Sequence, residues 1–224
     1  LPGHYSKADF TEIVTYAGRR GITVVPEIEG PGHSQAALAS YAELNCDGKA
    51  KDLYTGYVPS PDGLLCVRKA VTYEFLDDVI REVAALTPGP YLHIGSDEAH
   101  SMAPEDFAYY ISKVTPIVRK YGKKLIGWQE MVNGQPGEAI GQYWINGVNN
   151  DEVAAAAAKG TKFIMTPADH AYLDMKYNDA QPAYPLGNVW AGTTEVDDAY
   201  NWQPDTELPG VGESAVAGVE AALW

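Results

Sequence analysis

The feature of this sequence that most constrains its fold is the alternation of helix-like and short strand-like segments. Apolar residues recur at helical spacing over 8–20, 72–86, 104–121 and 149–160. Short apolar runs fit for strands lie at 22–28, 91–94, 124–128, 139–144, 162–167 and 216–224. Strands that alternate with helices in this way pair in parallel. The pattern therefore predicts an α/β fold with about six parallel strands.

Two architectures fit this number of strands, an open doubly wound sheet and an incomplete (β/α)8 barrel. No G-x-G-x-x-G motif follows the first predicted strand, which disfavours a dinucleotide-binding sheet. A barrel places its active site at the carboxyl ends of several strands. Polar or aromatic residues follow nearly every predicted strand: Glu27, Glu29, His33, Asp97, Glu98, Trp128, Glu130, Trp144 and Asp169. This placement favours the (β/α)8 barrel, with residues 1–224 forming a single domain.

The composition limits the partners of the chain. There are 16 Lys and Arg against 30 Asp and Glu, giving a formal net charge of −14. Because nucleic-acid binders concentrate basic residues, we expect no nucleic-acid partner. The apolar runs are shorter than the roughly 18 residues of a membrane helix, so we also expect no membrane span.

Cys46 and Cys66 are the two cysteines, and they flank a stretch rich in Gly and Pro. A disulfide between them would close a loop of about 20 residues and contribute roughly 3 kcal/mol. The alternative is two free thiols in a cytosolic protein. We favour the disulfide and expect a secreted or extracellular protein, while no signal peptide is visible in the chain.

The stretch YLHIGSDEAHS, residues 91–101, sets Asp97 and Glu98 side by side just after a predicted strand. The letters DEAH also occur in a nucleoside-triphosphatase signature, but the chain has no G-x-x-x-x-G-K-[ST] phosphate loop. A metal site would need His33, His93 or His100 to converge on Asp97, and no H-E-x-x-H or C-x-x-C pattern supports one. We therefore predict neither a metal nor a cofactor.

Carbohydrate chemistry is the third interpretation of the adjacent acids. Neighbouring side chains on a strand point to opposite faces, so Asp97 and Glu98 are expected to perform different tasks. Glycosidases use paired carboxylates around the anomeric carbon. Sugar rings also present apolar faces that pack on Trp and Tyr, and such residues lie at strand ends and in the late loops: Trp128, Trp144, Tyr172, Trp202 and Trp224.

Motifs along essentially the whole chain resemble, in order, the β-N-acetylhexosaminidases of glycoside hydrolase family 20. They are PEIEGPGHSQAAL, HIGSDEAH, GWQEM, QYW, AYLDMKY, YNWQP and GVEAALW. The resemblance implies a (β/α)8 barrel and retaining hydrolysis of terminal β-linked N-acetylglucosamine or N-acetylgalactosamine, in which the acetamido oxygen of the substrate is the nucleophile. The implied partner is an oligosaccharide or glycoconjugate containing an N-acetylhexosamine, in glycan or chitin degradation.

The resemblance also implies a role for each matching residue. Glu98 would be the general acid and base, and Asp97 would orient the acetamido group. His33 would tune the acid, and Asp174 would bind sugar hydroxyls. Aromatic residues would form the acetamido pocket or lie near the sugar: Trp128, Trp144, Tyr172, Trp202 and Trp224.

The chain departs from the family pattern at several places. Ser96 replaces the second glycine of the motif, which is tolerated if its backbone angle is not restricted to glycine, and Glu29 replaces an aspartate. We expect a catalytic-domain fragment that is truncated at both ends. It would lack the first two strands and, with them, an arginine that binds the sugar hydroxyls. It would also lack a glutamate that follows Trp224 by two residues. The alternatives are a relative that removes a disaccharide, similar to a lacto-N-biosidase, and a sugar-binding fragment without catalysis.

Overall fold

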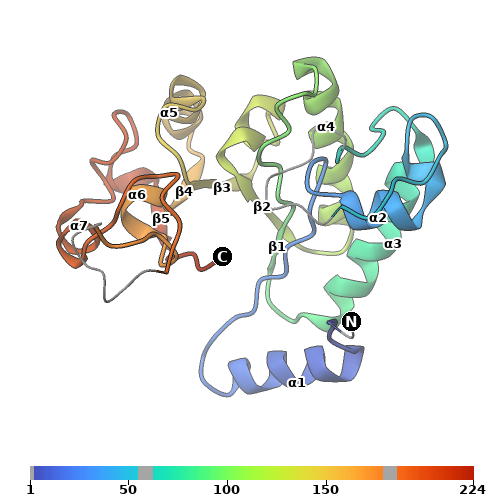
Figure 1. The fold of residues 1–224 in the computed structure, drawn as a ribbon, viewed down its shortest axis with the longest axis horizontal. Helices are drawn as coiled ribbons and strands as arrows, with labels where there is room; N and C mark the ends of the chain where they lie inside the picture. Colours follow the sequence, from blue (N-terminus) through green and yellow to red (C-terminus); the bar gives the residue numbers. More distant parts are fainter. Residues whose placement is uncertain (1–2, 55–62, 179–185) are drawn as a thin grey trace. The chain divides into compact units, whose positions relative to one another are not determined.

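The computed structural model of the chain describes residues 3–54, 63–178 and 186–224 (Figure 1). The chain forms two compact units. The first consists of Leu1–Gly127 and Asn133–Glu138, and the second of Trp128–Val132 and Ala139–Trp224.

The first unit contains two parallel strands and three long helices. Strands β1 (Tyr91–His93) and β2 (Lys124–Trp128) pair in parallel, with Leu92 opposite Leu125. Helix α3 (Ala70–Leu86) packs against α1 (Lys7–Gly18) and α4 (Pro104–Lys120). The short helices α2 (Gln35–Ser40) and η1 (Ala42–Leu44) complete the unit.

The sequence of α4 explains where this helix begins, where it ends and which face it buries. Pro104 occupies the first turn, where a missing N–H costs nothing, and acidic residues follow it. Basic residues occupy the last turn, beside the negative end of the helix dipole. Its buried face recurs at helical spacing: Phe107, Tyr110, Ile111, Val114, Thr115 and Val118.

The strand expected over 22–28 is reduced to a single parallel bridge between Glu27 and His93. The backbone N–H of Ile28 donates to the carbonyl of His93, and the N–H of His93 donates to the carbonyl of Pro26. Pro26 has no N–H, which limits the hydrogen bonds that this segment can contribute to a ladder. The prediction of about six strands was therefore one too high for the described residues, in which five strands form.

The second unit contains three parallel strands, β3 (Ala139–Tyr143), β4 (Lys162–Met165) and β5 (Val216–Val219). Its helices are α5 (Asn150–Ala158), α6 (Ala168–Ala171), α7 (Val196–Asn201) and η3 (Glu213–Ala215), while η2 (Gln129–Gly134) follows β2. One core of this unit consists of Val132, Tyr143, Val153, Phe163, Met165, Leu208, Val211 and Ala215.

Two further features bear on the sequence analysis. A disulfide joins Cys46 to Cys66, which are 20 positions apart. Among the residues that the structure describes, no helix combines the length and the apolarity needed to cross a membrane.

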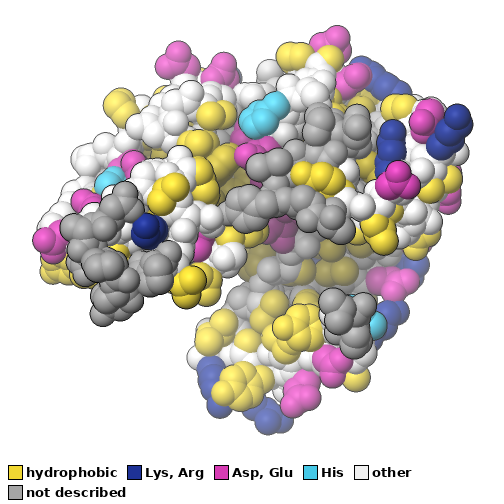
Figure 2. Space-filling model, viewed as in Figure 1, with side chains coloured by type: hydrophobic (Ala, Val, Ile, Leu, Met, Phe, Trp, Pro, Cys, Tyr) yellow, Lys and Arg dark blue, Asp and Glu magenta, His cyan; other side chains and the backbone are white. Residues whose placement is uncertain are grey.

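Hydrophobic side chains gather on the surface over α1 (Figure 2), where Tyr16 is 59% exposed.

Candidate active site

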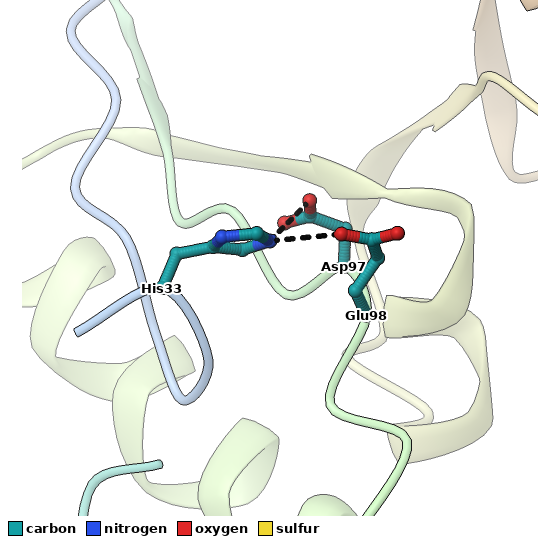
Figure 3. Close-up of side chains that lie close together, drawn as sticks. All are labelled: His33, Asp97 and Glu98. Atoms are coloured by element: carbon teal, nitrogen blue, oxygen red, sulfur yellow. Dashed lines mark ion pairs between the residues drawn. The ribbon is translucent and has the colours of Figure 1, made fainter. Parts of the chain in front are cut away.

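The two adjacent acids and one histidine come together in the first unit. Asp97 and Glu98 follow β1, and His33 lies in the turn that follows the bridge at Glu27. The Nε2 atom of His33 is 3.1 Å from Oδ2 of Asp97 and 3.3 Å from Oε2 of Glu98 (Figure 3). One imidazole thus contacts both carboxylates.

This geometry corrects the expectation that Asp97 and Glu98 point to opposite faces of a strand. Strand β1 ends at His93, and Glu98 has a φ of 51°, far from the extended backbone of a strand. The turn therefore brings both side chains to the same histidine nitrogen.

The backbone around these residues is strained. Among the described residues, five that are not glycine have a positive φ, and three of them are His33 (49°), Ser96 (82°) and Glu98 (51°). Such angles cost energy for residues with a side chain and cluster at functional sites. Ser96 therefore has a backbone angle that favours glycine, and its buried hydroxyl has no hydrogen-bond partner among the described residues.

The contacts of His33 set the charges of the group. Hydrogen bonds that His33 donates to Asp97 and, with a smaller effect, to Glu98 raise its pKa to about 10. The same contact with His33 lowers the pKa of Glu98. At neutral pH the resting site thus holds a protonated imidazole beside an ionised Glu98, and a protonated imidazole cannot ligate a metal. The absence of a metal at this site stays a prediction.

Glu29 and Glu27 form a second acidic group, next to Asp97. Burial, the negative charge of Asp97 and contact with Glu27 raise the pKa of Glu29 to about 9. A side chain at Gly95 would collide with the Glu29 carboxylate, so that glycine permits the close approach. The Nδ1 atom of His93 lies 3.0 Å from Oε1 of Glu27. Glu29 is therefore a half-buried acid that is neutral at pH 7.

The second unit brings four of the predicted aromatic residues together. The ring centroids of Trp128 and Trp144 are 6.3 Å apart, and Trp224 lies 6.2 Å from Trp128 and 6.4 Å from Tyr172. Trp190, which the sequence analysis missed, joins them at 5.9 Å from Trp144 and 5.7 Å from Tyr172. Its only signal in the sequence was its residue type, because it follows no predicted strand.

Hydrogen bonds fix the position of Trp144 within this aromatic cluster. The fully buried Gln129 accepts from the Trp144 backbone N–H at 2.8 Å. The indole Nε1 of Trp144 donates to Oε2 of Glu130 at 3.2 Å. Gln129 and Glu130 were present in the GWQEM motif, but their orienting role depends on contacts that a motif does not show.

The two remaining predicted residues have other partners. Trp202 stacks on His170, with centroids 5.8 Å apart and planes 4° from parallel, and it packs on the core beside β3 and β4 rather than in the aromatic cluster. Oδ2 of Asp174 accepts from Nδ2 of Asn188 at 2.9 Å. Oδ1 of Asp174 is buried and has no hydrogen-bond partner among the described residues.

Comparison with known proteins gives one consistent result. The family model described as glycosyl hydrolase family 20, catalytic domain, matches residues 1–107 and 100–224. A β-N-acetylhexosaminidase of Cellulomonas fimi is 42% identical over 224 residues, covering 99% of this chain and 44% of the relative.

Solved structures agree with the sequence match. A family 20 β-N-acetylhexosaminidase of Streptomyces coelicolor superposes with a TM-score of 0.94 and 53% identity, over 99% of this chain and 45% of that structure. A mutant β-hexosaminidase of Streptomyces plicatus, in complex with the product GlcNAc, gives a TM-score of 0.93 with the same identity and coverage. The chain spans less than half the length of these relatives.

Proposed function

This chain belongs to glycosyl hydrolase family 20, and on that premise we propose that it is part of an exo-acting β-N-acetylhexosaminidase. The fold agrees with the family, because the catalytic domain is a (β/α)8 barrel to which the described residues contribute five parallel strands. The proposed reaction releases terminal β-linked N-acetylglucosamine or N-acetylgalactosamine from an oligosaccharide or glycoconjugate.

The observation that carries this proposal is the contact of His33 with both Asp97 and Glu98. In the proposed reaction the acetamido oxygen of the substrate attacks its own anomeric carbon, and Glu98 protonates the departing glycosidic oxygen. Glu98 then takes a proton from the water that opens the cyclic intermediate. Asp97 accepts the acetamido N–H and stabilises the positive charge that develops on the ring.

His33 is the proposed source of the proton that Glu98 needs in the first step. Glu98 is ionised at neutral pH, and His33 lowers its pKa further below the ordinary value of 4.5, yet a general acid must be protonated when the bond breaks. The protonated Nε2 atom of His33 lies 3.1 Å from Asp97 and 3.3 Å from Glu98, within reach of either carboxylate. Transfer of that proton to Glu98 would leave a neutral imidazole and a carboxylic acid ready to protonate the leaving group.

The second unit supplies the proposed sugar-binding residues. Trp128, Trp144 and Trp224 present ring faces suited to the apolar parts of an acetamido group and a sugar. Tyr172 is assigned to the acetamido carbonyl. The unpartnered Oδ1 of Asp174 suits a sugar hydroxyl, which would satisfy the buried acceptor.

The test is hydrolysis of a chromogenic N-acetyl-β-glucosaminide by the full-length protein. Glu98→Gln keeps the size of the side chain but cannot donate a proton, and we expect kcat to fall by roughly 10²–10⁴. Asp97→Asn should reduce rates on N-acetyl substrates far more than on substrates without the acetamido group. Sugar binding without turnover by the wild-type protein would indicate a binding module, and release of a disaccharide alone would indicate a disaccharide-specific relative.

The proposal extends to the location of the protein. We propose that it is secreted and acts on glycans or chitin fragments outside the cell. The disulfide between Cys46 and Cys66 supports this, because disulfides persist in oxidising compartments. Enzyme activity in the cell fraction alone, with none in the medium, would contradict it.

A further inference from the structure

A second cluster of potential metal ligands lies in the second unit and has no part in the proposed reaction. Asp169 and His170 belong to α6, and Glu207 lies in the segment that follows α7. One ligand atom from each of the three side chains lies within 4.8 Å of the other two. We propose that Asp169, His170 and Glu207 bind a divalent transition-metal ion of the zinc class.

The distances within this cluster suit a shared ion better than direct hydrogen bonds. Nε2 of His170 lies 3.9 Å from Oδ2 of Asp169 and 3.8 Å from Oε2 of Glu207. Both distances exceed those of a hydrogen bond. Ligand atoms held at about 2.1 Å around tetrahedral zinc lie roughly 3.4 Å apart, so a small contraction would complete the site.

The donor set selects the class of ion. One imidazole nitrogen with two carboxylate oxygens suits zinc and its neighbours among the first-row divalent metals, whereas calcium and magnesium prefer oxygen alone. The side chain of Asp169 is 49% exposed and that of Glu207 only 11%. An ion could therefore enter from the solvent on the side of Asp169.

The two carboxylates of the cluster have no salt bridge to a Lys or Arg among the described residues, and each lies near His170 alone. A bound cation would supply the missing positive charge.

Tyr143 provides a second observation that points to a ligand at this cluster. Its side chain is fully buried, and its hydroxyl has no hydrogen-bond partner among the described residues. After burial, the charges that act on this hydroxyl are those of Glu207 and Asp169, so it faces the acidic side of the cluster. A metal-bound water would give the hydroxyl a partner.

The ion would connect α6 to the segment that carries Trp202. Because the Trp202 ring stacks on His170, a metal on the imidazole would lie beside the indole. The site would thus hold the Trp202 segment in place, and it gives a direct optical signal, since Co²⁺ quenches the fluorescence of a neighbouring tryptophan.

The experiment is titration of the metal-free full-length protein with Zn²⁺ by calorimetry and with Co²⁺ by tryptophan fluorescence. We expect one equivalent of Zn²⁺ to bind, and binding at least tenfold weaker in Glu207→Gln and in the more exposed Asp169→Asn. Glu98→Gln is the matched control for the His33 group and should bind as the wild type does. Trp202→Phe should keep Zn²⁺ binding and lose most of the Co²⁺ quenching.

Other results would overturn the proposal. They are no Zn²⁺ binding at 1 mM by the wild type, equal binding by Asp169→Asn and Glu207→Gln, or binding lost only in Glu98→Gln. Circular dichroism of each metal-free variant shows whether it is folded, and Asp169→Asn, whose side chain is half exposed, keeps the test valid if Glu207→Gln fails to fold. None of these outcomes depends on hydrolase activity.

Discussion

The Nε2 atom of His33 lies 3.3 Å from Oε2 of Glu98, and each group changes the titration of the other. The contact raises the pKa of the histidine and lowers that of the carboxyl. At neutral pH the pair therefore holds its proton on His33 rather than on Glu98, the residue proposed as the general acid. The pH dependence of the reaction should depend on this pair.

Removing the imidazole should move the pH profile of the enzyme. In His33→Gln the imidazole that holds the proton of the pair is gone, so Glu98 must carry this proton itself. We expect the basic limb of kcat/KM to shift to lower pH, because the wild-type pair keeps its proton up to the pKa of His33, about 10, whereas Glu98 alone loses it nearer the ordinary glutamate value of 4.5. The profile with a chromogenic substrate measures this, and an unchanged basic limb would contradict the coupling.

Ser96 predicts a stabilising substitution inside the motif. Its φ of 82° favours glycine, and its buried hydroxyl has no partner among the described residues. We expect Ser96→Gly to raise the free energy of unfolding by about 1 kcal/mol, after the larger backbone entropy of glycine in the unfolded chain is counted.

Thermal melts check this prediction against a matched serine. Ser112 lies in α4, where glycine has a low helix propensity, so Ser112→Gly should lower stability by roughly 0.5 kcal/mol. If both substitutions destabilised the protein alike, the positive φ at Ser96 would carry no strain.

Glu29 and His33 predict that stability falls as the pH rises. Glu29 has a folded-state pKa of about 9 against an ordinary value of 4.5, so its contribution is complete below pH 4.5 and is lost as the pH rises through 9. The contribution of His33 is complete below pH 6.5 and is lost as the pH rises through about 10.

A neutral side chain at position 29 should reduce this slope. Glu29→Gln stays uncharged at every pH, and each pKa unit corresponds to about 1.4 kcal/mol, so we expect the variant to be more stable than the wild type by at least about 1 kcal/mol at pH 8. Urea unfolding from pH 5 to pH 9 measures the difference. The exposed Glu82→Gln is the control and should leave the slope unchanged.

Asn188 should influence activity through Asp174. It donates to Oδ2 of Asp174 at 2.9 Å and leaves Oδ1 available to a ligand. Hydrogen bonds to charged groups contribute about 1.5–3 kcal/mol, so Asn188→Ala should lower kcat/KM by about tenfold or more, mainly through KM. Steady-state kinetics measure this, and an unchanged KM would show that Asp174 needs no support from Asn188.

Much of the site was predictable because barrel strands place their functional residues at their carboxyl ends. Trp128 is the last residue of β2, and Asp97, Glu98 and Trp144 follow β1 and β3, so all four were predicted from their place at the ends of strands. The resemblance implied that His33 tunes Glu98, but the contact of the same imidazole with Asp97 was not predicted, because it depends on positive φ angles that tertiary contacts impose. No periodicity in the chain encodes those angles.

The contacts of the loops near the C-terminal end of the chain were not predicted, for a different reason. Trp190 and the stacking of Trp202 on His170 arise where segments without regular periodicity fold back on the unit. Between residues 168 and 210, where the sequence predicts neither helix nor strand, the structure contains α6 and α7, which are too short for a periodic signal. The expected strand over 216–224 ends at Val219.

The tryptophans give the two units separate optical properties. All five lie in the second unit, and the rings of Trp128, Trp144, Trp190 and Trp224 approach neighbouring indoles at 5.9–6.3 Å in inclined orientations. Transitions of such rings couple, so we expect intense near-ultraviolet circular dichroism that vanishes when this unit loses its packing. The aromatic chromophores of the first unit are tyrosine and phenylalanine, besides histidine. The tryptophan signal therefore reports the loss of structure in the second unit separately from that in the first.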